Sequence, residues 1–358
     1  MTERPNGRAP LSSNVVAERP AAAAGSEATP PAPGGAAVSG ALAAAALAAL
    51  TVLVVHLLLP NGQTPQPAWT DALAPWLRPY PAALEAMFGA AVLLAALQGA
   101  WRPLRPWALH YAPLAAGTVV AFGAWDLITL KFGWMTLPFF PGPGAVLAAL
   151  VEDRALLFES TWHSLLLLLT GYAVGVTAGL VSGVLIGWFT RVRYWGMPIL
   201  RVVGPLPATA LIPLVMTLSS QAFVSAAALI GFAVWFPMTM LTASGIANVR
   251  ISYLDVARTL GAGRLYLIFR VALPSALPNI FLGLFMGLGA SFLTLIAAES
   301  VGVPAGLGWY LTWQQNFVEY AKMDASILIM ALFFSTLMTL LFAVRDRVLR
   351  WQKGVIKW

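Results

Sequence analysis

The segment from residue 250 to residue 280 places charged side chains between two strongly apolar runs. It contains Arg250, Arg258, Arg264 and Arg270, with Asp255 among them. Each arginine would cost about 2.5–3.5 kcal/mol at a bilayer centre, so the four together keep this segment out of the hydrocarbon. The pattern therefore predicts a polar segment at the membrane surface.

The same segment carries the signals of a compact helical structure. Ser252 followed by Asp255 is a capping-box pattern that would start a short helix, with Asp255 near its positive end. Gly261 is a natural stop where the chain reverses. A second amphipathic run follows at 264–270, and Pro274 fits the start of the next membrane helix. The apolar residues at helical spacing in the first helix are Leu254, Ala257 and Leu260. We therefore expect a firm knob made of a helix, a glycine turn and a second helix.

This arrangement resembles the loop by which permease subunits of binding-protein-dependent ABC importers bind their ATPase. The family pattern is E-A-A, three residues, a glycine, about nine residues, and I-x-L-P. The matching positions are 255–257, Gly261 and 271–274, with Asp in place of Glu and Val in place of the first Ala. The strings A-R-T-L-G-A-G-R-L and V-A-L-P-S-A-L-P are most similar to the subgroup that imports taurine, other sulfonates, nitrate, bicarbonate or thiamine precursors. The likeness covers about Leu137 to Arg350.

The resemblance implies a permease that works by alternating access and pairs with a second copy as a homodimer. It also implies two copies of an ATP-binding subunit, which hold ATP and Mg, and a periplasmic solute-binding protein. This chain has no G-x-x-x-x-G-K-[ST] loop, so we expect it to hydrolyse nothing and to hold no cofactor. The residues that the resemblance assigns to ATPase coupling are Asp255, Ala257, Arg258, Thr259, Leu260, Gly261, Ala262 and Pro274. From spacing alone, an ordinary amphipathic surface helix is the alternative.

The composition independently excludes a soluble globule, since 59% of residues are hydrophobic and 10% are charged. A spanning helix needs about 20 predominantly apolar residues. Windows that qualify lie near 36–59, 82–100, 111–130, 164–189, 196–217, 222–244, 276–298 and 325–344. The chain has no cysteine and only three scattered histidines, so neither a disulfide nor a metal site is expected. We predict an all-α polytopic membrane protein, in which a type I ABC importer-like core of about six spans follows two extra amino-terminal spans.

The net charge of +7 is distributed as a topology signal, and we expect no nucleic-acid partner. The basic groups are Arg102 and Arg105, Arg191 and Arg193, the four loop arginines, and Arg345, Arg347, Arg350, Lys353 and Lys357. The intervening segments carry Asp71, then Glu152, Asp153 and Glu159, then Glu319 and Asp324. The positive-inside rule therefore places both termini and the 250–270 loop in the cytoplasm of a bacterium, with the spans in its inner membrane.

The chain divides into three parts by composition. Residues 1–35 are rich in Ala, Pro, Gly and Ser and are expected to form a disordered cytoplasmic tail. A cleaved signal peptide fits less well, because the first apolar run begins late and is long enough to span. Residues 36–108 are expected to form an accessory two-span hairpin, whose role the sequence does not indicate. Residues 109–358 would form the permease core, with the ATPase-coupling loop at 250–274.

The 164–189 window contains a glycine at every fourth position. Such a ladder leaves a groove along one helix face, which allows a neighbouring backbone to approach closely. We favour tight helix packing as its role, and lining of the transport path is the alternative. The glycines are Gly171, Gly175, Gly179, Gly183 and Gly187.

Prolines interrupt the 196–217 window, and broken helices persist in a membrane where protein or a water-filled cavity satisfies the freed carbonyls. We therefore expect the segment 204–213 to border the transport path, with a kinked packing helix as the equal alternative. The candidate pathway residues are Gly204, Pro205, Pro207, Thr209, Pro213, Ser291 and Glu299. Glu299 would either brace an outer gate or face interfacial water, and we favour the second.

Two other classes of protein fit a bundle of apolar helices. An ion-coupled secondary transporter usually carries acidic groups or a broken-helix ion site near the midplane, and we find neither a buried acidic pair nor an internal repeat. A membrane-embedded structural or assembly subunit is the second rival. A membrane enzyme is not expected, because no nucleophile, base or metal constellation converges. The solute is expected to be a small anion, and the sequence does not identify it.

Overall fold

The computed structural model describes residues 35–62, 78–97, 104–135, 137–218 and 221–352, and every regular element in these ranges is a helix. Within these ranges, seven helices are long and apolar enough to cross a membrane. They are or include α1 (Gly35–Leu58), α3 (Pro79–Leu97), α4 (Leu104–Asp126), α6 (Arg154–Trp188), α9 (Ala222–Ala247), α12 (Leu273–Val301) and α14 (Tyr320–Val348). The all-α membrane prediction is confirmed. Residues 1–34 of the predicted tail lie outside the described residues.

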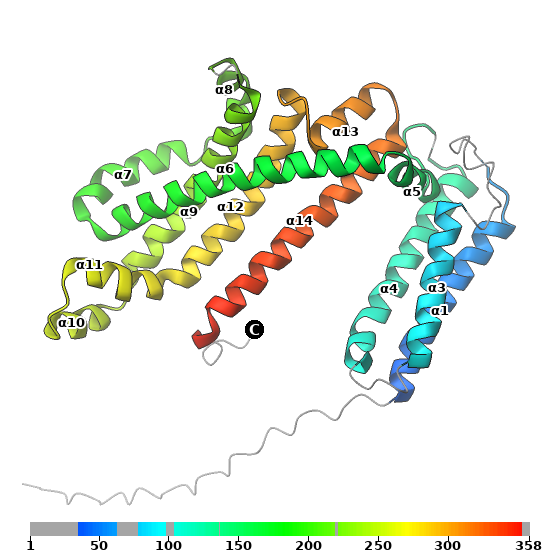
Figure 1. The fold of residues 1–358 in the computed structure, drawn as a ribbon, viewed down its shortest axis with the longest axis horizontal. Helices are drawn as coiled ribbons and strands as arrows, with labels where there is room; N and C mark the ends of the chain where they lie inside the picture. The colour runs from blue at the N-terminus through cyan, green and yellow to red at the C-terminus, as the bar shows by residue number, and fades with distance from the viewer. Residues whose placement is uncertain (1–34, 63–77, 98–103, 136, 219–220, 353–358) are drawn as a thin grey trace, which may run out of the picture.

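The window expected near 196–217 folds as a bent pair of helices (Figure 1). α7 (Thr190–Val203) and the helical segment formed by η3 (Ala208–Leu211) and α8 (Ile212–Leu218) meet at 80°. The prolines between them remove backbone donors, so that one continuous helix cannot form there.

The centre of the molecule is built on α6 and α9, which pack along each other over most of their length. All five ladder glycines of α6 are buried against α9. A Cβ added to Gly175 would lie 2.5 Å from the carbonyl oxygen of Gly231, and one added to Gly183 would lie 2.5 Å from Cβ of Thr242. The glycines therefore let two helix backbones approach more closely than side chains allow. α12 also packs along α9 and contacts α6.

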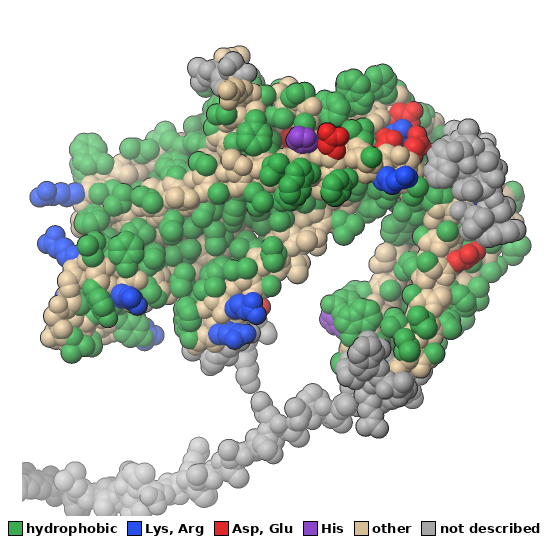
Figure 2. All heavy atoms as spheres, viewed as in Figure 1, with side chains coloured by type: hydrophobic (Ala, Val, Ile, Leu, Met, Phe, Trp, Pro, Cys, Tyr) green, Lys and Arg blue, Asp and Glu red, His purple; other side chains and the backbone are tan. Residues whose placement is uncertain are grey.

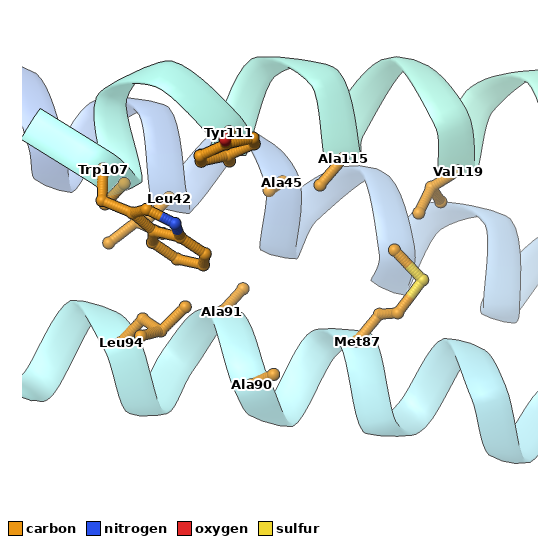
Figure 3. Close-up of a pocket in the computed structure, with 12 residues that line it drawn as sticks. Leu42, Ala45, Met87, Ala90, Ala91, Leu94, Trp107, Tyr111, Ala115 and Val119 are labelled. Carbon is orange, nitrogen blue, oxygen red and sulfur yellow. The ribbon is translucent and has the colours of Figure 1, made fainter. Parts of the chain in front are cut away.

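The amino-terminal helices form a separate group (Figure 1). α1 packs along both α3 and α4, so that α4, which the sequence placed in the predicted core, lies against the first of the two helices of the predicted hairpin. These three helices surround an apolar pocket, into which side chains such as Leu42, Met87 and Leu94 project (Figure 3). The boundary expected at residue 108 thus falls inside a three-helix group.

Polar contacts link the end of α1 to the end of α4 and to the segment that follows α4. Nδ1 of His56 and Oδ2 of Asp126 lie 2.8 Å apart, with Asp126 buried and His56 half-buried. Nζ of Lys131, in η2 (Leu127–Lys131), donates to the carbonyl oxygens of His56 and Leu59, both at 2.6 Å. This lysine therefore satisfies free carbonyls at the end of α1.

The helix α5 connects this group to the remainder of the chain. α5 (Pro143–Glu152) contacts α3, α4 and α6, and it also packs on the first turns of α14 through Val146, Ala149 and Ala325. α14 is largely half-buried or exposed, since only 6% of its most apolar window is buried. Figure 2 shows lysine and arginine side chains near α10, α11 and the end of α14, whereas most acidic side chains lie at the opposite end.

Candidate functional site

The segment expected to form a knob folds as two short helices joined by a glycine turn. α10 (Ile251–Thr259) is followed by Gly261 at φ +84°. The amide of Ala262 donates to the carbonyl of Ala257 at 3.0 Å, and the amide of Gly261 donates to that of Arg258 at 2.9 Å. These bonds form a Schellman motif, which requires a left-handed residue at Gly261. A Cβ there would meet nothing within 4 Å, so the need for glycine is conformational.

The start of α10 differs from the expected capping box. The N-cap is Arg250, whose side chain makes no capping hydrogen bond, and the first turn contains no acidic residue. Ser252 and Asp255 thus lie two residues too far into the helix, and the capping-box prediction is wrong. Its physical reason is the preceding helix, because α9 ends at its C-cap Asn248 and leaves only one residue before the N-cap of α10.

The outward surface of the knob exposes apolar side chains around one ion pair. α10 contributes no buried residue, and Leu260 is 83% exposed. Nη1 of Arg258 donates to Oδ1 of Asp255 at 3.0 Å, with both side chains more than half exposed. A hollow in this surface is lined by Tyr253, Val256, Ala257, Leu260, Gly261, Ala262, Gly263, Tyr266 and Val271. Exposed apolar side chains grouped in this way mark an interaction surface.

The base of the knob is fixed to the helix bundle. After α11 (Arg264–Tyr266), the π-helical segment η4 (Leu267–Ala272) buries Leu267, Ile268 and Ala272. Ala272 belongs to the same buried cluster as Ile246 of α9. Pro274 lies in the first turn of α12, directly after the π-helical segment. The knob is therefore anchored at its base and open at its tip.

The residues expected to border a transport path lie in two places. Those at 204–213 surround the bend between α7 and α8, where Gly204 packs against the ring of Phe236. The exposed members of this group are Pro205, Pro207, Thr209 and Pro213. Ser291 is buried in α12, and its hydroxyl donates to the carbonyl of Leu288 at 2.7 Å within the same helix.

Glu299 does not face interfacial water, and that expectation is wrong. Its side chain is 1% exposed because α13 (Leu307–Asn316) folds back over the end of α12. Oε1 accepts a hydrogen bond from the hydroxyl of Ser164 at 2.7 Å, and Oε2 accepts one from the amide of Gly308 at 2.8 Å. The hydroxyl oxygen of Ser164 accepts the amide of Leu307 at 2.8 Å. The carboxylate and the serine together satisfy two free amides at the start of α13.

Two glycines make room for this carboxylate. Gly306 has φ +107°, and a Cβ there would overlap the Glu299 carboxylate. A Cβ at Gly308 would lie 2.6 Å from the carbonyl oxygen of Ile296. We refer to Ser164, Glu299, Gly306 and Gly308 as the outer clasp.

A second contact holds α13 in place. The hydroxyl of Tyr310 donates to Oδ2 of Asp153 at 2.7 Å, and Nζ of Lys322 lies 3.4 Å from the same oxygen. Burial raises the pKa of Tyr310, and the hydrogen bond to the Asp153 carboxylate raises it further. The phenol therefore remains a donor, and it ties α13 to the junction between α5 and α6.

Sequence reasoning missed most of the outer clasp and this second contact. Ser164 had no local signal, because its partner Glu299 lies 135 positions away. The glycine-rich string V-G-V-P-A-G-L-G directly after Ser300 was the one hint that backbone would approach the preceding carboxylate closely. Among the described residues, no group of three or more His, Cys, Asp or Glu side chains could hold a metal.

The structure thus defines a helical integral-membrane protein that exposes a group of apolar side chains at one end. Comparison with protein families identifies the class: residues 175–354 match the binding-protein-dependent transport system inner membrane component, and the chain belongs to this family of ABC transporter permeases. The matched range includes the knob, α12 and three members of the outer clasp, Glu299, Gly306 and Gly308, whereas Ser164 lies before it.

Three similar proteins are named for the transport or import of aliphatic sulfonates, taurine or nitrate. The chain is 31% identical to the putative aliphatic sulfonates transport permease protein SsuC of Escherichia coli, over 64% of this chain and 88% of that protein. It is 29% identical to the taurine transport system permease protein TauC of Escherichia coli, over 64% and 86%. It is 28% identical to the nitrate import permease protein NrtB of Leptolyngbya laminosa, over 66% and 87%.

Proposed function

We propose that this chain forms the translocation path of an ATP-driven importer for a small anionic solute of the sulfonate, taurine or nitrate kind. Three similar permeases are named for these solutes, and they share the oxyanion chemistry of a sulfonate or nitrate group. The observation that carries the proposal is the knob, a pre-formed helix–turn–helix whose tip buries nothing in its own chain. Such a surface has the character of a docking site for a separate motor subunit.

In this proposal the knob transmits motion without taking part in chemistry. A cytoplasmic ATP-binding subunit receives α10 and the Gly261 turn in a surface cleft, with Leu260 as the apolar contact and Arg258 as the charged one. When the ATP-binding subunits close on ATP, they displace the tip of the knob. Because η4 and Ala272 are packed against α9, the displacement moves α12 and opens the path to one side at a time.

The proposed assembly has two permease copies, two ATP-binding subunits and a periplasmic solute-binding protein. ATP and Mg belong to the motor subunits, and this chain holds no cofactor. Both termini and the knob lie in the cytoplasm, because the lysine and arginine groups gather at the knob end of the molecule. The segment Gly204–Pro213 borders the path, and the group of α1 and α3, with α4 packed on it, is an accessory to the core.

Reconstituted vesicles test this function. The chain, its ATP-binding subunit and its binding protein are reconstituted together, and uptake of labelled taurine, an alkanesulfonate and nitrate is measured with ATP supplied to the cytoplasmic side. We expect ATP-dependent uptake of one of them that continues after a protonophore collapses the proton gradient. Uptake that needs the gradient but not ATP would establish a secondary transporter. Failure of any ATP-binding subunit to co-purify would favour a structural subunit.

Gly261→Asp tests the knob directly. The new side chain would meet nothing in this chain, so membrane insertion should stay normal while the motor cleft is blocked and uptake falls at least tenfold. Two controls separate the possible causes: Asn316→Asp adds the same charge at the exposed last residue of α13, and Gly261→Ala introduces the backbone strain at φ +84° without the charge. Both should retain uptake. Normal uptake by Gly261→Asp would refute docking at this turn.

A further inference from the structure

The outer clasp lies at the opposite end of α12 from the knob, and the mechanism above gives it no role. α12 has 29 residues, which corresponds to about 43 Å of helix between the two ends. At the knob end the chain exposes its side chains. At the other end it buries a carboxylate and satisfies both oxygens of that carboxylate.

Opening the clasp would be costly. Glu299 is surrounded by protein, and removing either hydrogen bond would leave a polar atom buried without a partner. Because Ser164 bonds to both Glu299 and the amide of Leu307, the contacts on α6, α12 and α13 depend on one another. The three elements are therefore joined at one point.

The remainder of α13 strengthens this junction. Its buried side is tied to Asp153 through Tyr310. Its other side presents a row of aromatic rings, with Trp309 and Trp313 centred 5.4 Å apart and Trp313 and Phe317 5.2 Å apart. Exposed tryptophan at a helix of this kind is typical of the membrane–water interface. α13 is thus held by the bundle on one side and by the interface on the other.

We propose that Glu299 is a positioning residue that joins the outer ends of α6, α12 and α13 into a single rigid body. This rigid body is the fixed point about which the rest of α12 moves when the knob is displaced. This inference rests on the proposed function. The side chain acts through the geometry of its hydrogen bonds to Ser164 and Gly308 and not through its charge.

Three substitutions separate geometry from charge. Glu299→Gln preserves the clasp, because the amide oxygen can accept from Gly308 while the amide nitrogen donates to Ser164. Glu299→Ala removes both contacts. Ser164→Ala is milder and leaves the amide of Leu307 and one carboxylate oxygen without partners. We expect uptake per ATP hydrolysed to stay within about twofold of wild type for Gln, and to fall about tenfold or more for Ser164→Ala and for Glu299→Ala.

Matched controls come from the same helix, α6. Glu159→Gln neutralises an exposed carboxylate, and Thr161→Ala removes a hydroxyl that bonds only within its helix, to the carbonyl of Leu157. Both should leave uptake per ATP unchanged. ATP hydrolysis and co-purification of the ATP-binding subunit should stay normal in all five variants, because the knob is intact. If Glu299→Ala does not insert, Ser164→Ala alone decides the question.

A distance measurement tests rigidity directly. The chain has no cysteine, so spin labels placed by Glu159→Cys on α6 and Gln315→Cys on α13 report one distance. We expect that distance to change by less than about 2 Å between nucleotide-free and ATP-trapped complexes, and its distribution to broaden in the Ser164→Ala background. The uptake of the wild-type complex is measured first, so failure of the proposed function is recognised separately.

Each result has a defined meaning. Loss of uptake in Glu299→Gln equal to that in Glu299→Ala would show that charge itself is required, and it would overturn the positioning role. Normal uptake per ATP in Ser164→Ala would do the same. A large change in the α6–α13 distance between nucleotide states would show that the clasp opens, and it would refute the rigid body.

Discussion

The two ends of α12 satisfy their polar and apolar groups in opposite ways. At the knob, Leu260 and the pair of Asp255 and Arg258 are exposed, and no residue of α10 is buried. At the outer clasp, Glu299 is buried and every contact that it needs comes from its own chain. An end whose polar and apolar groups are satisfied within the chain can serve as a fixed point, whereas an end that exposes its apolar groups requires a partner. From this difference we infer that the knob end of α12 moves, whereas the clasp end keeps its position.

Two glycines with positive φ give the largest expected contrast. Gly306→Ala forces a side chain into a conformation available almost only to glycine and against the Glu299 carboxylate, so we expect a loss of about 3 kcal/mol or more. Gly261→Ala has free space and should cost about 1–2 kcal/mol, from conformation alone. Thermal unfolding followed by tryptophan fluorescence in detergent compares them. Equal midpoints would remove the distinction between the two ends.

Two leucines sharpen the same comparison. Leu307 is 2% exposed, and its truncation to alanine should leave a cavity that costs about 2–3 kcal/mol. Leu260→Ala should change stability by less than about 0.5 kcal/mol and yet reduce the amount of ATP-binding subunit that co-purifies. A Leu260→Ala variant that unfolds early but retains its partner would place this leucine in the core and not in a docking surface.

Tyr310→Phe tests the second contact of α13. The phenol donates to Asp153, and the substitution removes that one bond while Lys322 still lies beside the carboxylate. We expect a loss of about 1 kcal/mol, seen as a small decrease in the unfolding midpoint. A loss as large as that of Gly306→Ala would mean that this contact, more than Glu299, fixes α13.

The smallest effect is expected at the knob ion pair. Asp255→Asn removes the charge from a pair that is more than half exposed on both sides, so stability should change by no more than about 0.5 kcal/mol. Any larger consequence should appear in ATP-dependent uptake, measured at two salt concentrations because exposed charges are screened. A clear destabilisation of the isolated chain would contradict an open knob.

The sequence predicted elements better than it predicted contacts. Long apolar windows and the Gly261 stop depend on local residue types, and helices occupy each window that was expected. The burial of Glu299 depends on Ser164 and Gly308, and the grouping of α4 with α1 depends on packing between distant segments. The capping-box error at Ser252 has the same origin, because the end of α9 decided where α10 begins.

The exposed surface of α14 has a consequence for the measured stability of the protein. Only 6% of its most apolar window is buried in its own chain, so the molecules that cover its exposed side chains enter the folding equilibrium as ligands of the native state. The melting temperature of this protein is therefore a property of the chain together with its lipid, detergent or neighbouring subunit. It should rise with the concentration of whichever of these binds the helix, even when nothing else in the sample is changed.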